Sequence, residues 1–135
     1  MGDSATWGYM KGFAVWREED DAKRNEELLD FLDSIGERIQ REPEEMAELD
    51  TLLPGFLAEF KKLPHWDLIW GHGEVSYCSM GDQRGGSVGW HWKTQGSWKG
   101  YNPKPKDLAA LKRLLLKYGY KVGASIPDGI FAYEG

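Results

Sequence analysis

The chain has 135 residues and a net charge of −5, with 41% hydrophobic and 13% aromatic residues. This length and composition fit one domain with a hydrophobic core and argue against intrinsic disorder. No apolar run approaches the roughly 20 residues of a membrane-spanning helix, and the first residues lack the charged and apolar regions of a secretion signal. The single cysteine excludes an internal disulfide and fits a reducing compartment. We therefore expect a cytoplasmic single domain over residues 1–135.

Charge is distributed unevenly along the chain. Residues 1–65 carry 16 acidic and 8 basic side chains, a net charge of −8, whereas residues 66–135 carry 6 acidic and 9 basic side chains, a net charge of +3. An acidic surface repels nucleic acid and attracts basic protein surfaces. The same acidic run also fits a helix face that is simply solvated.

A first strand is predicted over residues 6–16. Tyr9 and Phe13 fall on one face of it, and Met10 and Ala14 fall on the other, because side chains alternate along a strand. Since both faces carry apolar residues, we expect a central position in the sheet.

An acidic helical part is predicted over residues 17–63. Its first helix runs from about Glu18 to Arg41, with acidic residues in the early turns that complement the helix dipole. Pro43 ends that helix and fits the first turn of a second one. Pro54-Gly55 is predicted to break or kink this second helix.

The central region, Trp66–Trp98, holds five of the seven tryptophans. Its first residues predict a short strand, and the Gly-rich stretch 81–86 predicts the loop of an aromatic hairpin. The expected register across that loop places Ser79 opposite Val88, Cys78 opposite Gly89, Tyr77 opposite Trp90, Ser76 opposite His91, Val75 opposite Trp92, and Glu74 opposite Lys93.

The C-terminal part predicts a helix followed by a second hairpin. The helix runs from about Pro105 to Tyr118, and Gly119 is the expected residue after its end. Residues 120–126 alternate as a strand, Pro127-Asp-Gly129 is typical of a turn, and residues 130–133 then return antiparallel.

This element order predicts an α+β fold. We expect an antiparallel sheet of about four to six strands with three helices, in a split β-α-β, ferredoxin-like plan with an extra helix. Such a plan does not by itself indicate a function.

Motifs for catalysis or cofactor binding are missing from the sequence. It has no Walker loop, no dinucleotide fingerprint and no paired cysteines. We therefore expect no cofactor, no metal and no enzymatic activity. Two alternatives are a nucleophile formed by Cys78 and His91, and a metal site formed by His72, Cys78 and His91. In the simplest interpretation, Cys78 is a buried thiol and His91 a half-buried ring.

The aromatic content leaves two possibilities open. Seven tryptophans could all fill the core, or some could remain exposed as anchors of a protein interface or as platforms for bases. The chain resembles the small anti-CRISPR and toxin-immunity proteins of phages and bacteria. The resemblance lies in its small size, its acidic helical part, its aromatic region and its lack of catalytic motifs. This resemblance implies a helix over Glu18–Asp30 that mimics nucleic-acid charge against a basic partner.

We therefore expect a non-enzymatic inhibitor that blocks a bacterial nucleic-acid-processing protein or complex, with no membrane partner. It is expected to act through an acidic helical face and an aromatic patch, and its partner-binding residues are expected to be Glu18, Glu19, Asp20, Asp21, Arg84, Trp92, Trp98, Lys99 and Tyr101. The alternative is a single-stranded nucleic-acid-binding module. Its sheet would present Trp90, Trp92 and Trp98, and its phosphate contacts would be Arg84, Lys93, Lys99, Lys104 and Lys106.

Overall fold

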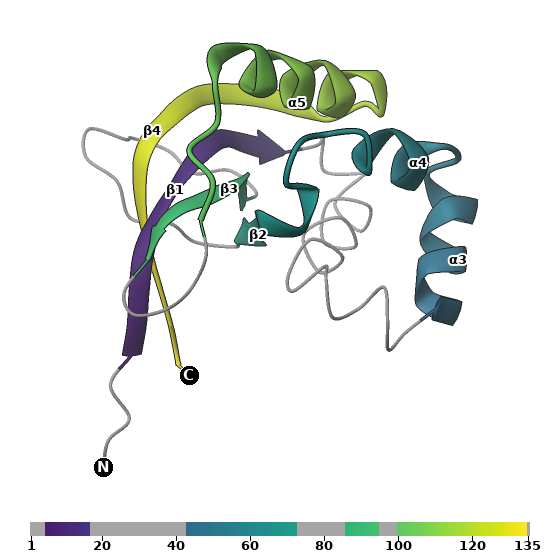
Figure 1. The fold of residues 1–135 in the computed structure, drawn as a ribbon. Coiled ribbons are helices and arrows are strands. Elements are labelled where there is room, and N and C mark those ends of the chain that lie inside the picture. Colours follow the sequence, from purple (N-terminus) through teal and green to yellow (C-terminus); the bar gives the residue numbers. More distant parts are fainter. Residues whose placement is uncertain (1–4, 17–42, 73–85, 95–99, 135) are drawn as a thin grey trace.

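A computed structural model describes residues 5–16, 43–72, 86–94 and 100–134 of the chain (Figure 1). The elements of these ranges are strand β1 (Ala5–Trp16), helix α3 (Pro43–Leu52), helix α4 (Phe56–Phe60), the 3₁₀ helix η2 (Trp66–Leu68), strand β2 (Ile69–His72), strand β3 (Gly86–Thr94), helix α5 (Pro105–Lys117) and strand β4 (Lys121–Glu134).

The described strands form one antiparallel sheet in the order β2-β3-β1-β4. β3 lies between β1 and β2 and is antiparallel to both, so β1 and β2 are parallel to each other with a strand inserted between them. This is the split β-α-β arrangement. The prediction of an α+β fold with a ferredoxin-like plan is confirmed, and so is the central position of β1, which lies between β3 and β4.

Two of the predicted helices fall in the described ranges. The second breaks at Pro54-Gly55, as predicted, and Gly55 takes a left-handed conformation with φ of 83° that separates α3 from α4. The third helix is α5, and Gly119 after its end has φ of 86°. The helix predicted from Glu18 to Arg41 lies outside the described residues.

The predicted register of the aromatic hairpin is wrong. β3 pairs with β2, so Trp90 lies opposite Ile69 instead of Tyr77. On its other edge β3 pairs with β1, where Trp90 lies opposite Lys11. Both edges of β3 are therefore occupied at Val88, Gly89 and Trp90, which excludes the predicted partners of these three residues. Residues 73–85, which include the predicted loop, lie outside the described part of the chain.

The predicted C-terminal hairpin is also wrong, because residues 121–134 form one long strand along β1. Pro127-Asp-Gly129 does not turn the chain. Instead, two residues of β4 lie between the partners of Met10 and Gly12, where β1 has one, so the segment forms a bulge. Proline has no backbone N–H to donate, and it is tolerated here because β4 lies at the sheet edge in a bulged register.

The hydrophobic core lies between the sheet and the helices. Trp90 is fully buried at its centre, and its indole Nε1–H donates a hydrogen bond to the carbonyl oxygen of Pro64 at 2.9 Å. The cluster around it includes Phe56, Phe60, Ile69, Val88, Leu111, Leu115 and Tyr120. Met10 and His91, which are cross-strand partners, are buried outside this cluster, so both faces of the sheet are covered at this level.

Candidate functional site

Two of the predicted partner-contact residues belong to the described part of the chain. Trp92 is near the end of β3 and Tyr101 precedes α5, and both are partly exposed. The other predicted contacts lie outside the described residues: Glu18, Glu19, Asp20, Asp21, Arg84, Trp98 and Lys99.

Trp92 is placed by an irregularity of the sheet. Tyr9 pairs with Lys93 and Met10 pairs with His91, so Trp92 is the extra residue of a β-bulge on β3. A bulge redirects a side chain relative to the regular ladder and is common next to functional sites. Trp92 therefore has no direct partner across β1, unlike the fully buried Trp90 two residues earlier.

A small group of side chains surrounds this indole, and we call Tyr9, Lys11, Trp92 and Asn102 the Trp92 cluster. Lys11 Nζ lies 4.5 Å from the Trp92 ring centroid, within the range of a cation–π interaction. The same ammonium donates a hydrogen bond to Asn102 Oδ1 at 2.7 Å. The Tyr9 ring lies 6.0 Å from Trp92 with a tilt of 41°. The cluster thus presents two aromatic rings and one cation on the same side of β1 and β3.

The indole N–H of Trp92 differs from that of Trp90. Its Nε1 atom is buried and has no hydrogen-bond acceptor among the described residues. A buried donor without an acceptor costs about 1–3 kcal/mol. A phenylalanine at this position would avoid that cost, so the indole is not explained by stability alone.

Tyr101 is tied into the fold by its backbone N–H, its hydroxyl and its ring. Its backbone N–H donates to the carbonyl oxygen of His91 at 2.9 Å, and its hydroxyl donates to Oδ2 of Asp107 at 2.5 Å. Its ring stacks on His65 with centroids 4.3 Å apart and meets Trp90 edge-on. Tyr101 therefore connects the sheet, the turn before η2 and the start of α5.

Asp107 caps the start of α5. Its carboxylate accepts a hydrogen bond from the backbone N–H of Lys104 at 2.9 Å and another from the Tyr101 hydroxyl. Burial opposes its charge, but these two hydrogen bonds and the nearby Lys106 and Lys104 outweigh burial and lower the pKa of Asp107. The hydrogen bond between the Tyr101 hydroxyl and Asp107, together with burial, raises the pKa of Tyr101. Asp107 is therefore a charged helix cap.

A second feature is a groove of about 280 Å³ between α4 and α5. Its apolar floor consists of Leu63, Ala110 and Leu114, and its rim carries four charged side chains. Those side chains are Glu59, Lys62, Arg113 and Lys117. We call these seven residues the α4–α5 groove.

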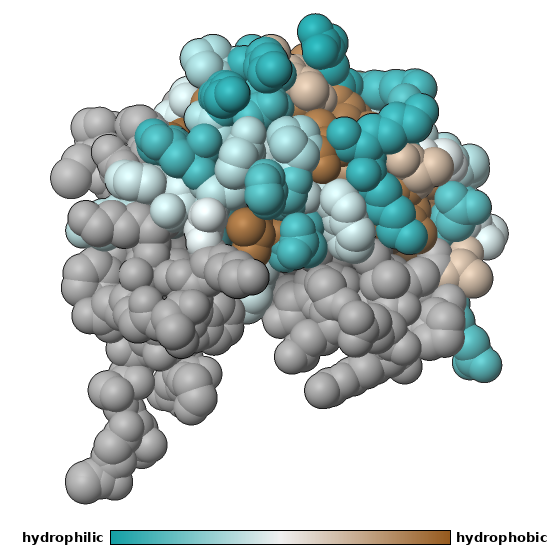
Figure 2. Space-filling view, in the orientation of Figure 1, coloured by the Kyte–Doolittle hydropathy of each residue, from teal (hydrophilic) through white to brown (hydrophobic). Residues whose placement is uncertain are grey.

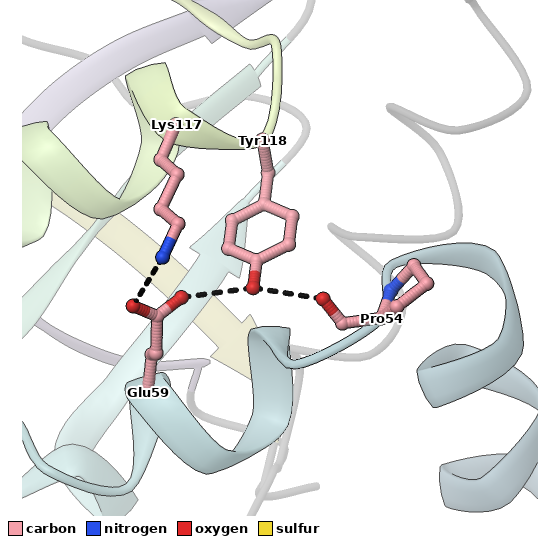
Figure 3. Close-up of polar contacts among 4 residues, drawn as sticks. All are labelled: Pro54, Glu59, Lys117 and Tyr118. Atoms are coloured by element: carbon pink, nitrogen blue, oxygen red, sulfur yellow. Dashed lines mark hydrogen bonds and ion pairs between the residues drawn. The ribbon is translucent and has the colours of Figure 1, made fainter.

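Two rim residues, Glu59 and Lys117, belong to a polar network with Tyr118 and Pro54 (Figure 3). Lys117 Nζ lies 2.7 Å from Oε1 of Glu59, and the Tyr118 hydroxyl lies 2.8 Å from Oε2 of Glu59 and 2.9 Å from the carbonyl oxygen of Pro54. The hydrogen bond from Lys117 and then that from Tyr118 lower the pKa of Glu59. Burial and the Glu59 carboxylate raise the pKa of Tyr118 to about 12, so its hydroxyl stays protonated at neutral pH.

The surface around α4 and α5 is basic. Figure 2 shows hydrophilic residues over most of the described part of one face, with hydrophobic patches between them. The exposed cations of this region are Lys61, Lys62, Lys104, Lys106, Lys112, Arg113, Lys117 and Lys121. The sequence places Lys112, Arg113 and Lys117 off the apolar stripe of the helix, but it does not indicate that Lys62 from the turn after α4 lies near them. The groove was therefore not predicted.

The described residues do not support the alternative of a nucleophile formed by Cys78 and His91, or that of a metal site formed by His72, Cys78 and His91. His91 is buried, with 2% of its surface exposed, and its ring lies 4.5 Å from that of Trp70. Its proposed proximity to Cys78 depended on the register that the structure excludes, and Cys78 lies outside the described residues. Among the residues that the structure describes, no three His, Cys, Asp or Glu side chains are grouped to hold a metal ion, and no helix has the length and apolarity to cross a membrane.

Comparisons with protein families, with curated proteins and with solved structures found no match to this chain. The candidate sites are therefore defined by geometry alone. They are the Trp92 cluster at the sheet and the α4–α5 groove between the helices.

Proposed function

We propose that this protein is a non-enzymatic protein-binding module that inhibits a bacterial nucleic-acid-processing protein or complex, in the manner of anti-CRISPR or toxin-immunity proteins. The observation that carries the proposal is the Trp92 cluster. It combines a partly exposed tryptophan, a second aromatic ring and a lysine 4.5 Å from the indole centroid.

This combination is suited to a protein interface. Tryptophan and tyrosine dominate the residues that contribute most binding energy at such interfaces, because they bury a large area with few rotatable bonds. The contacts from Lys11 and Tyr9 hold the Trp92 ring in place before a partner arrives. Such preorganisation reduces the entropy that binding must overcome.

The nucleic-acid alternative has less support from the geometry. It requires Trp90 to stack on a base, but Trp90 is fully buried and bonded to the carbonyl oxygen of Pro64. Lys104 and Lys106, which that alternative assigns to phosphates, are exposed. The alternative thus retains Lys104 and Lys106 and loses one of its three stacking platforms.

The expected target follows from charge. Residues 1–65 carry a net charge of −8, and such a surface favours a partner with a basic, nucleic-acid-binding face. In this proposal Glu18, Glu19, Asp20 and Asp21 contact that face, and Trp92 anchors an adjacent part of the partner. Occupation of the basic face by the inhibitor then excludes the nucleic acid.

Affinity purification of the tagged protein from bacterial lysate, with and without nuclease, tests the proposal. We expect a stoichiometric protein partner that survives nuclease treatment and is identified by mass spectrometry. Trp92→Ala is expected to reduce its recovery at least about tenfold, as loss of an interface anchor does. Recovery of nucleic acid alone, or loss of the partner on nuclease treatment, contradicts the proposal.

Trp66→Ala is the matched control. Trp66 is also partly exposed and also has a lysine near its ring, with Lys61 Nζ 5.9 Å from the centroid, but it lies outside the Trp92 cluster. We expect Trp66→Ala to retain the partner. Thermal melting of both variants confirms that each is folded at the temperature of the experiment.

A further inference from the structure

We infer that the α4–α5 groove binds one face of an acidic amphipathic helix belonging to the protein partner. This inference rests on the proposed protein-binding function and assigns a chemical class to one segment of the partner. It is carried by the apolar floor of the groove, the excess of cations over carboxylates in its rim and the fixed position of its walls.

The floor of the groove is apolar although its rim is charged. Leu63 and Leu114 lie at the bottom with 7% of their surfaces exposed, and Ala110 leaves room above them because its side chain is a single methyl group. The groove encloses about 280 Å³, below the roughly 300–1,000 Å³ of typical small-molecule pockets. That size fits a few apolar side chains of a peptide better than a complete cofactor.

The rim has an excess of positive charge. Of its four charged side chains, Glu59 and Lys117 form an ion pair with each other. Lys62 and Arg113 are exposed, and neither forms an ion pair within the described part of the chain. They face the groove from two different elements, so carboxylates on both sides of a bound segment would each meet a cation.

The two walls of the groove are held at a fixed separation. Tyr118 follows α5, and its hydroxyl bonds both to Glu59 on α4 and to the carbonyl oxygen of Pro54 before α4. Its ring meets Phe56 edge-on with centroids 5.3 Å apart. A groove with fixed walls is formed before a ligand binds, which reduces the cost of ordering it.

An amphipathic helix fits this groove better than a nucleic acid does. Helices bind grooves through apolar residues at positions i, i+3, i+4 and i+7, which would occupy the floor over Leu63, Ala110 and Leu114. A phosphate backbone makes no use of an apolar floor. Acidic residues on the flanks of the helix pair with Lys62 and Arg113.

The test uses a synthetic amphipathic peptide with leucines at the helical anchor positions and glutamates on the flanks, and a scrambled peptide of the same composition. A single-stranded oligothymidylate of equal charge is the nucleic-acid probe. Binding to the full chain is measured by fluorescence anisotropy, and the site is located by amide NMR shifts. We expect the ordered peptide to bind, with shifts centred on Lys62, Ala110 and Arg113.

Variants locate the interaction in the groove. Lys62→Glu combined with Arg113→Glu is expected to weaken peptide binding at least about tenfold, and Ala110→Gln, which places a polar side chain over the floor, to weaken it similarly. Lys112→Glu, the same charge reversal on an exposed α5 residue outside the groove, is expected to change binding by less than about twofold.

Several results overturn the inference. These are no binding of the ordered peptide, equal binding of the scrambled peptide, tighter binding of the oligothymidylate, and NMR shifts away from the groove. If a captured partner is recovered equally by the Lys62→Glu, Arg113→Glu protein, the groove inference fails while the proposed function stands. If no protein partner exists, the proposed function fails, and the peptide titration still decides whether the groove takes such a helix.

Discussion

The hydroxyl oxygen of Tyr118 lies 2.8 Å from Oε2 of Glu59, which joins the residue that ends α5 to α4 across 59 positions of sequence. The same hydroxyl lies 2.9 Å from the carbonyl oxygen of Pro54, and its single proton is shared between the two acceptors. The pair sets the distance between the helices that form the groove, so the stability of the helical layer and the shape of the groove depend on the same contact.

Tyr118→Phe is expected to destabilise the protein by about 1 kcal/mol, because it removes the shared hydrogen bond and keeps the ring contact with Phe56. Urea unfolding measures the change. Lys117→Gln, which removes the exposed ion pair with Glu59 and the contact of the ammonium with the Tyr118 ring, is expected to cost less. A Tyr118→Phe protein as stable as the parent would contradict the importance given to this contact.

Asp107 is expected to make stability depend on pH on the acid side. Its pKa in the folded protein lies below the ordinary 3.8, so the unfolded chain binds its proton more tightly. The stabilisation is therefore complete above about pH 5 and is lost as the pH falls through the lowered pKa. Asp107→Asn is expected to flatten the fall in unfolding free energy between about pH 5 and pH 2, as measured by denaturant titration at each pH.

Tyr101→Phe provides the companion measurement for Asp107. The Tyr101 hydroxyl is one of the groups that lower this pKa, so its removal is expected to flatten the same part of the pH profile partially. An unchanged profile in both variants would show that Asp107 does not control acid stability.

Trp90 and Trp92 are expected to respond differently to substitution by phenylalanine. Trp90→Phe leaves a cavity in the core and removes the hydrogen bond to Pro64, so we expect a loss of about 2–4 kcal/mol. Trp92→Phe removes a buried N–H that has no acceptor among the described residues, and we expect a change within about 1 kcal/mol. Thermal or urea unfolding measures the loss of stability in each variant. Equal losses in the two variants would contradict the expected difference between Trp90 and Trp92.

Gly12 is expected to tolerate no side chain. A Cβ atom there would lie 1.9 Å from the carbonyl oxygen of Val88 and 2.5 Å from Cα of Gly89, both backbone atoms of β3. Relief of this overlap requires the two central strands to separate, so Gly12→Ala should cost about 3 kcal/mol or more, or prevent folding. Ala14→Gly on the same strand is the comparison, with an expected loss of about 1 kcal/mol.

Local features of the sequence determined several elements of this protein. The helical period between Pro105 and Lys117, together with Gly119 after it, was sufficient to predict α5. Pro54-Gly55 was sufficient to predict the break between α3 and α4. Apolar residues on both faces of β1 were sufficient to predict its central place in the sheet. In each case the cause lies within a few residues of its effect, in backbone preference or in side-chain period.

Only the tertiary structure decided which segments meet. The partner of Trp90 is Ile69 instead of Tyr77, a shift of an even number of residues that keeps the same faces of the strands together, so alternation could not distinguish the two registers. The bulge that redirects Trp92 depends on how β1 and β3 pair along their whole length. The groove requires Lys62, just after α4, and Arg113 of α5, which are distant in sequence, to line the same cavity. Pairing and packing between distant segments are set by the total surface that they bury together, and no local pattern records that sum.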